Sequence, residues 1–466
     1  MALISISKLS FAHEGNPEKV FENVSFQLET DWKLGFIGRN GRGKTTFLQL
    51  LMGKYPYEGR ISTSTEFEYF PFPVQHPDQP AGKLIESLVP QVAPWQIERE
   101  TSLLKLDVSA LQRPFKTLSN GEQTKILLAS LFLNENRFLL IDEPTNHLDT
   151  SGRRAVSEYL NTKKGFILVS HDRAFLDACI DHVLSINRAN IEVQQGNFSS
   201  WWENKRRQDQ FELDEDRKLR KELRRLNAAT KRTANWSTQV EKTKSKRHNK
   251  SEGMIDKGFI GHKSAKMMAR SKTIAARREE KLNEKNQLLQ NLEEDASLKL
   301  FPLQFHSRTL FELSDLSIRY GQHTAISNFS MRMESGERIA LMGSNGSGKS
   351  SLLKFIHGEA LEHSGQRIQN PQLRIAYLPQ QTAELKGSLY DYMQRHALDE
   401  KQFKIVLSQL DIPHTQFDLP METFSMGQKK KIALARNMCE PAHLFLWDEP
   451  LNYIDLISRI QLEQVL

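Results

Sequence analysis

Two glycine-rich runs in the chain have the residue types and spacing of phosphate-binding loops. They span residues 38–45 and 343–350, and each ends in Gly-Lys followed by a hydroxyl residue. Each follows an apolar stretch expected to form a strand, residues 34–37 or 339–342, and leads into a helical pattern. The glycines let backbone N–H groups curl around an anion at a helix N-terminus. One such run could be an accidental glycine turn, whereas two matching runs predict two nucleotide sites.

The side chains of these runs provide candidates for binding ATP and Mg²⁺. Lys44 and Lys349 are expected to reach the β- and γ-phosphates, and the hydroxyls of Thr45 and Ser350 to ligate Mg²⁺. The other candidate ATP-binding residues in and beside the runs are Gly38, Asn40, Gly41, Gly43, Thr46, Gly343, Asn345, Gly346, Gly348 and Ser351.

The two runs belong to a longer internal repeat. Lys349 follows Lys44 by 305 residues, whereas the later matched pairs Ser119/Ser425, Glu143/Glu449 and Asp149/Asp455 are 306 residues apart. An offset that drifts by one residue over such a distance indicates two homologous domains.

A second repeated element follows each lysine, at 75 or 76 residues. It reads Leu-Ser-Asn-Gly-Glu at 118–122 and Phe-Ser-Met-Gly-Gln at 424–428, and each copy is expected to open a helix. Taken alone, such a run is equally consistent with a serine N-cap. Its spacing from the glycine-rich loop makes the sequence resemble the ATP-binding-cassette (ABC) family, which has a Leu-Ser-Gly-Gly-Gln-like signature. The resemblance implies that Ser119, Gly121, Ser425 and Gly427 contact ATP.

Twenty-four residues after each signature serine, an apolar strand pattern ends in two acids, at 142–143 and 448–449. Buried carboxylates are costly unless a cation pairs with them, and Mg²⁺ with ATP supplies one. By resemblance to the family, Asp142 and Asp448 hold the metal, and Glu143 and Glu449 polarise the attacking water as catalytic bases.

The resemblance assigns three further residues. His171, after an expected strand at 166–169, stands at the switch position that senses the γ-phosphate; Gln380 stands at a metal-contacting position; Tyr320 stands at the adenine-stacking position. The resemblance also implies head-to-tail pairing of the domains, which would form two sites. Site one combines Lys44, Thr45, Asp142, Glu143 and His171 with Ser425 and Gly427, and site two combines Lys349, Ser350, Asp448 and Glu449 with Ser119 and Gly121.

The first domain departs from the family pattern in two places. His13, with Phe11 nearby, takes the place of the stacking aromatic, and Phe72 takes the place of the glutamine, with Gln75 three residues later. The glutamine's role is therefore not carried over to site one. Adding 306 to 171 gives 477, beyond the last residue, so the second domain is expected to lack its switch histidine and to stop short of its final strand and helices.

About a hundred residues with dense charge separate the two domains. Apolar side chains recur at helical spacing on both sides of glycines 253, 258 and 261, which predicts a helical hairpin whose first helix runs from Glu203 to about Val240. The recurring residues are Phe211, Leu219, Leu223, Leu226, Leu282, Leu289 and Leu292. The predicted fold is α/β: two P-loop ABC-type nucleotide-binding domains in tandem (1–200 and 306–466) joined by a long α-helical hairpin linker (201–305).

The basic character of the chain is concentrated in this linker. Residues 231–272 contain 12 Lys/Arg and 3 Asp/Glu, a net of +9, so the rest of a chain of net charge +7 sums to −2. Acidic and basic residues mix before 231 and after 272, as on a solvated spacer. The middle instead favours nucleic acid. Its candidate RNA-binding residues are Lys242, Lys244, Lys246, Arg247, Lys250, Met254 and Phe259, although Met254 and Phe259 could instead pack on each other to close the turn.

Composition excludes several other classes of protein. The longest apolar stretch falls short of the ~18 residues that a membrane span needs, and the N-terminus alternates like a first strand rather than a secretory signal. Cys179 and Cys439 are too few and too far apart for a disulfide framework or a zinc site, and are expected to be buried small apolar residues. A cytoplasmic location is expected, with ATP and Mg²⁺ as cofactors and no other metal site.

Two cassettes, no membrane span and a charged helical linker resemble the ABC-F proteins, ATPases that act on ribosomes. The runs at 32–35, 113–115, 424–428 and 447–453 read like the antibiotic-resistance branch of Vga/Lsa type. Other members often insert a helical arm in the first cassette, but 43 residues from Gln75 to Leu118, and 44 from Gln380 to Phe424, leave no room for one.

This resemblance implies a partner and an activity. The ATP-closed form, a monomer with its two cassettes paired, binds the ribosomal E site, contacting large-subunit rRNA and the E-site tRNA region. Its hairpin protects the peptidyl-transferase centre from lincosamides, pleuromutilins and streptogramin A, and ATP hydrolysis drives release. A general ABC-F translation factor, the ATPase subunit of a drug exporter and a DNA-repair or chromosome ATPase remain alternatives.

Overall fold

The computed structural model describes residues 2–13, 19–134, 137–146, 148–187, 190–245, 298–344, 346–380 and 385–466, together with 266, 269, 272–277 and 279–282. The chain divides into two compact units. One contains Met1–Ile186, Ile191–Ser199 and Asp295–Leu466, and the other contains Asn187–Asn190 and Ser200–Glu294. The first unit holds both copies of the repeat, called here the first cassette (up to residue 199) and the second cassette (from residue 298).

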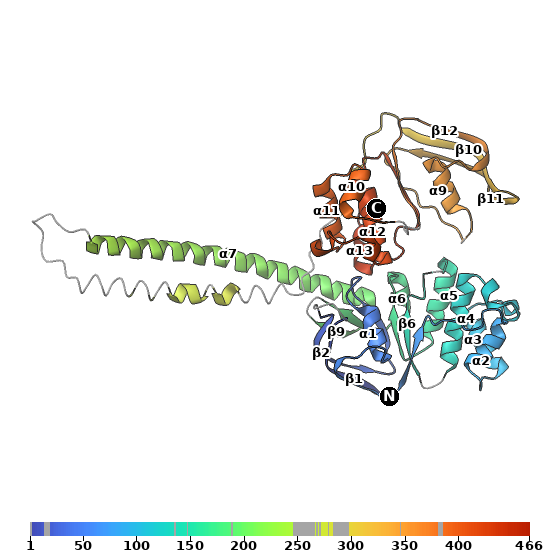
Figure 1. Cartoon of the computed structure of the whole chain (residues 1–466), viewed down its shortest axis with the longest axis horizontal. Helices are drawn as coiled ribbons and strands as arrows, with labels where there is room; N and C mark the ends of the chain where they lie inside the picture. The colour runs from blue at the N-terminus through green and yellow to red at the C-terminus, as the bar shows by residue number, and fades with distance from the viewer. Residues whose placement is uncertain are drawn as a thin grey trace, which may run out of the picture. The chain divides into compact units, whose positions relative to one another are not determined.

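The first cassette combines strands and helices in the order of an α/β domain (Figure 1). Its strands are β1 (Leu3–Phe11), β2 (Phe21–Glu29), β3 (Lys33–Ile37), β4 (Glu58–Ser62), β5 (Glu66–Phe70), β6 (Arg137–Asp142), β7 (Phe166–Val169), β8 (His182–Ile186) and β9 (Ile191–Gln195). Its helices are α1 (Lys44–Leu51), α2 (Ala81–Leu88), α3 (Pro94–Leu103), α4 (Asn120–Leu133), α5 (Thr150–Asn161) and α6 (Arg173–Cys179), with 3₁₀ turns η1 (Val108–Gln112) and η2 (Phe115–Thr117).

Helix α1 lies between two sheets of this cassette. The strands of one sheet pair in the order β5-β6-β7-β3-β8-β9, parallel except for β9, and those of the other pair antiparallel in the order β2-β1-β4. Phe47 and Leu48 of α1 are fully buried in one core with Ile4 of β1 and Phe36 of β3. Burial on both sides fixes the start of α1, and with it the glycine-rich loop before it.

The second cassette repeats only part of this arrangement. Its strands are β10 (Thr309–Tyr320), β11 (His323–Glu334), β12 (Glu362–Gln369), β13 (Ile375–Leu378) and β14 (Leu444–Trp447). Its helices are α9 (Lys349–His357), α10 (Leu389–Arg395), α11 (Glu400–Gln409), α12 (Met426–Cys439) and α13 (Leu456–Glu463), with 3₁₀ turns η3 (His414–Gln416) and η4 (Met421–Thr423). The antiparallel order β11-β10-β12 matches β2-β1-β4, and β13 pairs in parallel with β14 as β5 does with β6.

The expected strand at 339–342 is not formed, so that prediction was wrong. Ile339 is 44% exposed and Met342 is 82% exposed, whereas Leu34 and Phe36 of the matching strand β3 are fully buried. Strand β3 is paired with β7 on one side and β8 on the other. Residues 339–342 pair with none of the described strands of the second cassette, and a strand needs a neighbour to satisfy its backbone groups.

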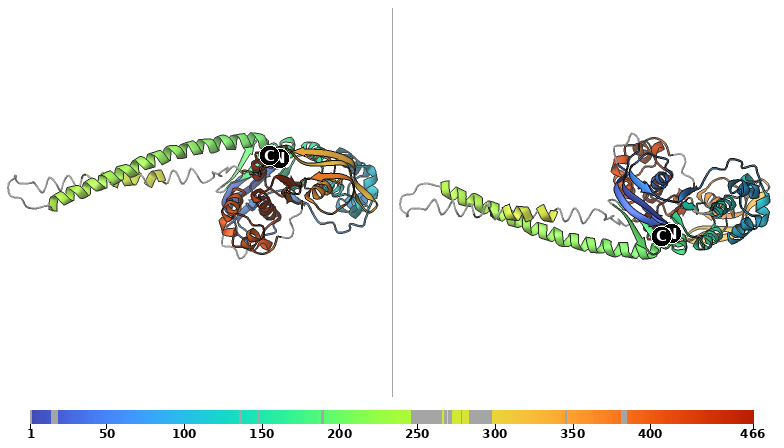
Figure 2. Two further views of the ribbon diagram at one scale, coloured as in Figure 1. Left: turned by 90° about the horizontal axis from the view of Figure 1, so that it is seen from above. Right: turned by 90° about the horizontal axis from the view of Figure 1, so that it is seen from below.

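Helix α7 (Phe198–Ser245) connects the first cassette to the second unit and is continuous in the views of Figures 1 and 2. Its 48 residues extend about 72 Å at ~1.5 Å per residue, further at both ends than predicted. Leu219 and Leu223 are buried as the apolar spacing predicted, but Phe211 is 64% exposed. Residues 272–277 and 279–282 of the expected returning arm are helical. Leu289, Leu292 and the three glycines lie outside the described residues.

The described helices and the two cysteines bear on membrane spans and disulfides. In the part of the chain that the structure describes, no helix combines the length and the apolar character needed to cross a bilayer. Cys179 is buried, which raises the pKa of its thiol, and Cys439 is partly buried. Neither cysteine forms a disulfide.

A buried carboxylate ties α3 to α5 in the first cassette. Glu100 is 1% exposed and accepts hydrogen bonds from the Tyr159 hydroxyl (2.6 Å), Lys163 Nζ (2.5 Å) and Arg99 Nη2 (2.8 Å). Burial alone raises the pKa of Glu100, but these three hydrogen bonds outweigh it and the net pKa lies below its ordinary value. The carboxylate is therefore charged at neutral pH and fully engaged.

We expect Glu100→Gln to lower the free energy of unfolding of this cassette by about 3 kcal/mol at pH 7, because Lys163 loses its buried counter-charge. Since the folded-state pKa is depressed, this stabilisation is present above the unfolded-state pKa of about 4.3 and is lost as pH falls through the folded value. Urea unfolding at pH 7 and at pH 3.5 measures the difference, which should shrink at the lower pH. Glu158→Gln, which removes an exposed ion-paired carboxylate, is the control. Equal midpoints for the two variants at pH 7 would contradict the prediction.

Candidate nucleotide sites

The loop between β3 and α1 is curled around its own lysine. Gly43 has a φ of 89°, and a Cβ there would lie 2.5 Å from Val20 Cγ1, so only glycine fits. Lys44 Nζ donates to the carbonyl oxygens of Gly38 (2.7 Å) and Arg39 (3.2 Å). The ammonium is buried, which lowers its pKa. An anion at the loop would replace these two carbonyl contacts with a stronger charge-assisted one.

A hydroxyl and a carboxylate meet next to this lysine. Thr45 Oγ1 donates to Asp142 Oδ2 at 3.0 Å, and the Tyr69 hydroxyl donates to the same oxygen at 2.9 Å. Burial raises the pKa of Asp142, which marks a carboxylate short of positive charge. Mg²⁺ prefers oxygen ligands of these kinds and completes its shell with water and phosphate. The residues present therefore fit a Mg–nucleotide complex.

Glu143 has the environment of a catalytic base. Its φ is 52°, in the left-handed region, and its Oε1 is buried without a hydrogen-bond partner among the described residues. Burial, reinforced by the charge of Asp142, raises the pKa of Glu143 to about 8. His171 Nε2 lies 3.4 Å from Oε1, and burial lowers the pKa of His171 well below its ordinary value. An unsatisfied carboxylate oxygen beside a neutral imidazole leaves a place for a polarised water.

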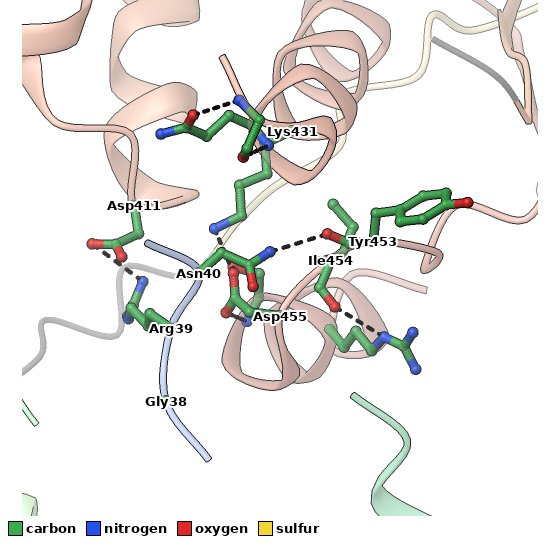
Figure 3. Close-up of polar contacts among 12 residues, drawn as sticks. Gly38, Arg39, Asn40, Asp411, Lys431, Tyr453, Ile454 and Asp455 are labelled. Atoms are coloured by element: carbon green, nitrogen blue, oxygen red, sulfur yellow. Dashed lines mark hydrogen bonds and ion pairs between the residues drawn. The ribbon is translucent and has the colours of Figure 1, made fainter. Parts of the chain in front are cut away.

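The signature of the second cassette faces the glycine-rich loop of the first. Asn40 Nδ2 donates to the backbone oxygen of Tyr453 at 3.0 Å (Figure 3). A Cβ on Gly427 would lie 2.7 Å from both of these atoms, so the helix start approaches the loop closely. Ser425 caps that helix, α12, and Ser119 caps α4 in the same way. The N-cap interpretation is thus confirmed, and Gly427 in the first turn of α12 also lies next to the first glycine-rich loop.

The second glycine-rich loop has the same internal contacts. Lys349 Nζ donates to the carbonyl oxygens of Gly343 and Ser344, both at 2.9 Å. The Tyr320 hydroxyl lies 3.1 Å from Ser351 Oγ. The corresponding pair in the first cassette is His13 Nε2 and Thr46 Oγ1, at 3.4 Å. His13 and Tyr320 therefore occupy equivalent positions, which the sequence could only suggest.

The carboxylates of the second cassette differ from those of the first. Glu449 also has a left-handed φ, of 46°, but its Oε2 accepts hydrogen bonds from Gln380 Nε2 and Asn452 Nδ2, both at 2.6 Å. Asp448 is 4% exposed. Gln380 thus donates to the carboxylate of Glu449, whereas the first cassette has Phe72 at the matching position, and a phenyl ring has no N–H to donate.

A cleft of about 1200 Å³ lies between the second glycine-rich loop and the signature of the first cassette. Residues from both cassettes line it, among them Ser119, Gly121, Asp149, Tyr320, Gly343, Gly346, Gly348, Lys349, Ser350, Ser351, Gln380 and Glu449. The structure therefore brings together Lys349, Ser350, Glu449, Ser119 and Gly121 of predicted site two, and at predicted site one it places Gly427 next to the loop of Lys44.

Some predicted residues fall elsewhere. Asn345, Lys246, Arg247, Lys250, Met254 and Phe259 lie outside the described residues. Lys242 and Lys244 lie on the backbone of α7, and their side chains are outside the described part. The linker-tip assignment stays a prediction.

Sequence reasoning missed two features of site one. The first is the hydrogen bond from Tyr69 to Asp142. The sequence offered one sign of it, because Tyr-Phe-Pro-Phe at 69–72 matches Tyr-Leu-Pro-Gln at 377–380, so the tyrosine is shared by both domains. Lys431 Nζ lies 2.5 Å from Asp455 Oδ2, and both side chains are buried (Figure 3). In the sequence, Asp455 indicated only the offset of the internal repeat. The number of residues between Lys431 and Asp455 does not predict an ion pair between them.

The fold and the site geometry together define the class of protein. A family model described as "ABC transporter" matches residues 21–146 and 326–452, more than half of the chain. The chain belongs to this family of ATP-binding proteins and carries two of its ATPase domains in tandem.

Particular relatives match over nearly the whole length. The chain is 27% identical over 483 residues to the ribosome protection protein VmlR of Bacillus subtilis, covering 100% of this chain and 82% of VmlR. It is 26% identical over 465 residues to the ATP-binding protein Uup of Caulobacter vibrioides, covering 96% and 70%. Among solved structures, archaeal ribosome recycling factor aABCE1 in complex with stalk protein aP1 matches with a TM-score of 0.59 at 17% identity, covering 95% of this chain and 78% of that one. This last likeness concerns the fold alone.

Proposed function

We propose that the chain is an ABC-F ATPase that binds the ribosome in its ATP-closed form and protects the peptidyl-transferase centre from antibiotics. Lys44 and Lys349 hold the phosphates, with Ser425 and Gly427, or Ser119 and Gly121, closing over them from the opposite cassette. Thr45 with Asp142, and Ser350 with Asp448 and Gln380, would hold Mg²⁺, which would neutralise the charge of the phosphates. Glu143 and Glu449 accept the proton of the attacking water, and His171 positions it at site one.

The observation that carries the ribosome proposal is a basic face on α7. From 217 to 232 the helix has 8 Lys/Arg and 1 Asp/Glu, a net of +7, so the mixing of charges inferred before residue 231 holds only up to residue 216. The first three of these cations are bound by acids on their own helix: Arg217 by Asp214, Lys218 by Glu215 and Arg220 by Asp216.

The next five cations, Lys221, Arg224, Arg225, Lys231 and Arg232, are exposed and form no ion pair among the described residues. Residues three and four apart lie on one side of a helix, so these side chains form a stripe about 17 Å long, opposite the buried Leu219 and Leu223. We call these five residues the α7 basic face. Like charges this close repel one another unless a polyanion neutralises them, and RNA is bound largely through its phosphates and shape.

The likeness to VmlR, a ribosome protection protein, over the whole of this chain and 82% of VmlR supports the antibiotic-resistance branch over the alternatives. Binding of the closed form in the ribosomal E site would direct the far end of the linker at the peptidyl-transferase centre. Lincosamides, pleuromutilins and streptogramin A are the drugs we propose to be displaced. ATP then acts as a timer: binding at both sites closes the cassettes, and hydrolysis releases the protein.

Cell-free translation inhibited by a lincosamide tests this proposal. We expect the protein with ATP to restore translation several-fold and to co-sediment with ribosomes but not with membrane vesicles. Deleting residues 253–261 should abolish the rescue while co-sedimentation persists. Co-sedimentation without rescue would instead favour a general translation factor, and binding to vesicles alone would favour an exporter subunit.

A further inference from the structure

One contact between the two cassettes has no counterpart at the second site. Arg39 Nη1, in the loop of the first cassette, lies 3.7 Å from Asp411 Oδ1, in the turn after α11 of the second cassette (Figure 3). The Arg39 side chain is 5% exposed and the Asp411 side chain 21% exposed. The ion pair is thus largely withdrawn from water, where it is screened less than a surface pair.

The internal repeat identifies the matching positions on the other side. Ser344 matches Arg39, since the loops are offset by 305 residues, and Lys105 matches Asp411 at an offset of 306. Lys105 and Asp411 stand in equivalent turns: each has a left-handed φ (53° and 62°), and each backbone N–H bonds the carbonyl of the residue three positions earlier. At site two a serine and a lysine therefore replace the arginine and the aspartate. No ion pair can form between them, and Lys105 binds Glu158 instead, at 2.6 Å.

Further contacts join the first loop to the second cassette. At site one the Asn40 side chain bonds Tyr453 and Gly427 approaches Asn40, so the first loop and the second signature are in contact. At site two the loop and the opposite signature line a cleft of about 1200 Å³. The ion pair and the Asn40–Tyr453 hydrogen bond thus hold the glycine-rich loop that carries Arg39 to the second cassette.

We propose that Arg39 and Asp411 are positioning residues that hold site one partly assembled before ATP binds, so that site one binds ATP more tightly and opening and closing take place mainly at site two. The inference rests on the proposed head-to-tail nucleotide sites, and it adds that site one is assembled before site two closes. A preformed site has less conformational freedom to lose when its ligand binds. The ion pair transmits this advantage only to site one.

ATP binding measured at one site at a time tests the proposal. Lys349→Ala disables the loop of site two and Lys44→Ala that of site one, each in a background with Glu143→Gln and Glu449→Gln to prevent turnover. In the Lys349→Ala protein, Asp411→Asn should weaken ATP binding about tenfold, a typical coupling between sites. Asparagine keeps the left-handed turn, so the change removes the charge alone. In the Lys44→Ala protein the same substitution should change the affinity less than about twofold on that scale.

Two further variants guard against a general effect on folding. Arg39→Ser copies the residue of the second loop and should cause the same loss as Asp411→Asn, and the double variant should lose no more than either single one. Asp418→Asn, an exposed carboxylate on the same part of the second cassette, should have no effect. Additive losses, or an unchanged affinity in the Lys349→Ala protein, would overturn the proposal.

Hydrogen exchange in nucleotide-free protein gives an independent reading. Asp411→Asn should speed exchange in residues 38–43 and 453–455 but not in 343–348, because only the first loop loses its anchor. Equal protection in the two proteins would count against the role of the ion pair. Failure of the Lys349→Ala protein to bind ATP at all would count against the proposed nucleotide sites. The hydrogen-exchange comparison would still show whether the Arg39–Asp411 ion pair holds the first loop.

Discussion

Turnover of ATP should fall at least about 100-fold when Glu143 and Glu449 are both changed to Gln, while ATP binding is retained. The amide keeps the size of the carboxylate but cannot accept a proton from water. At site one the loss is direct, because Glu143 Oε1 is buried, lies 3.4 Å from His171 Nε2 and has no hydrogen-bond partner among the described residues. At site two Gln380 and Asn452 already hold the Glu449 carboxylate, and they can hold an amide oxygen equally well. The fold should therefore survive the change.

Phosphate release and equilibrium binding of ATP measure the two halves of this expectation. Glu158→Gln with Glu463→Gln removes the same number of carboxylates from the exposed surfaces of the two cassettes and should leave turnover near normal. The catalytic variant should also accumulate on ribosomes with ATP, since closure is no longer followed by hydrolysis. Turnover at the wild-type rate would remove both glutamates from the catalytic role.

Ribosome binding should lose about two units of salt slope when Lys221, Arg224 and Arg225 are changed to Gln. Each cation that contacts a phosphate of single-stranded RNA releases about 0.7 of a counterion, so three contacts account for this loss. The affinity at low salt should fall on the order of 100-fold through the same term. Glutamine is nearly as good a helix former as lysine and arginine, so α7 itself should persist.

The adjoining part of the same helix offers a matched control. Arg217, Lys218 and Arg220 carry the same total charge, but acids three or four residues earlier already bind them. Their replacement by Gln should change the slope much less than replacement of the first triple. Sedimentation with ribosomes at several salt concentrations compares the two. If the two triple variants changed the salt dependence of ribosome binding equally, the α7 basic face would be an ordinary solvated surface.

The sequence by itself determined the local elements of the nucleotide sites. Glycines before a lysine, a serine before a helix and apolar runs ending in acids each follow from the conformations of a few consecutive residues. The helices after both loops, the caps at Ser119 and Ser425 and the buried strands β6 and β14 all appear where the patterns placed them. The repeat offset then indicated two copies, because homologous domains keep the same order of motifs.

Only the tertiary structure decided what lies between these elements. The Arg39–Asp411 and Lys431–Asp455 ion pairs depend on how side chains far apart in the chain, or spaced without a pattern, meet in space. Residues 339–342 are as apolar as β3, yet remain exposed, because a strand forms only where neighbouring strands bond its backbone groups. The α7 basic face likewise depends on the helix, because helical spacing lets acids three or four residues away bind some cations and leaves others exposed. Local patterns set which residues can act, and three-dimensional packing sets which of them act together.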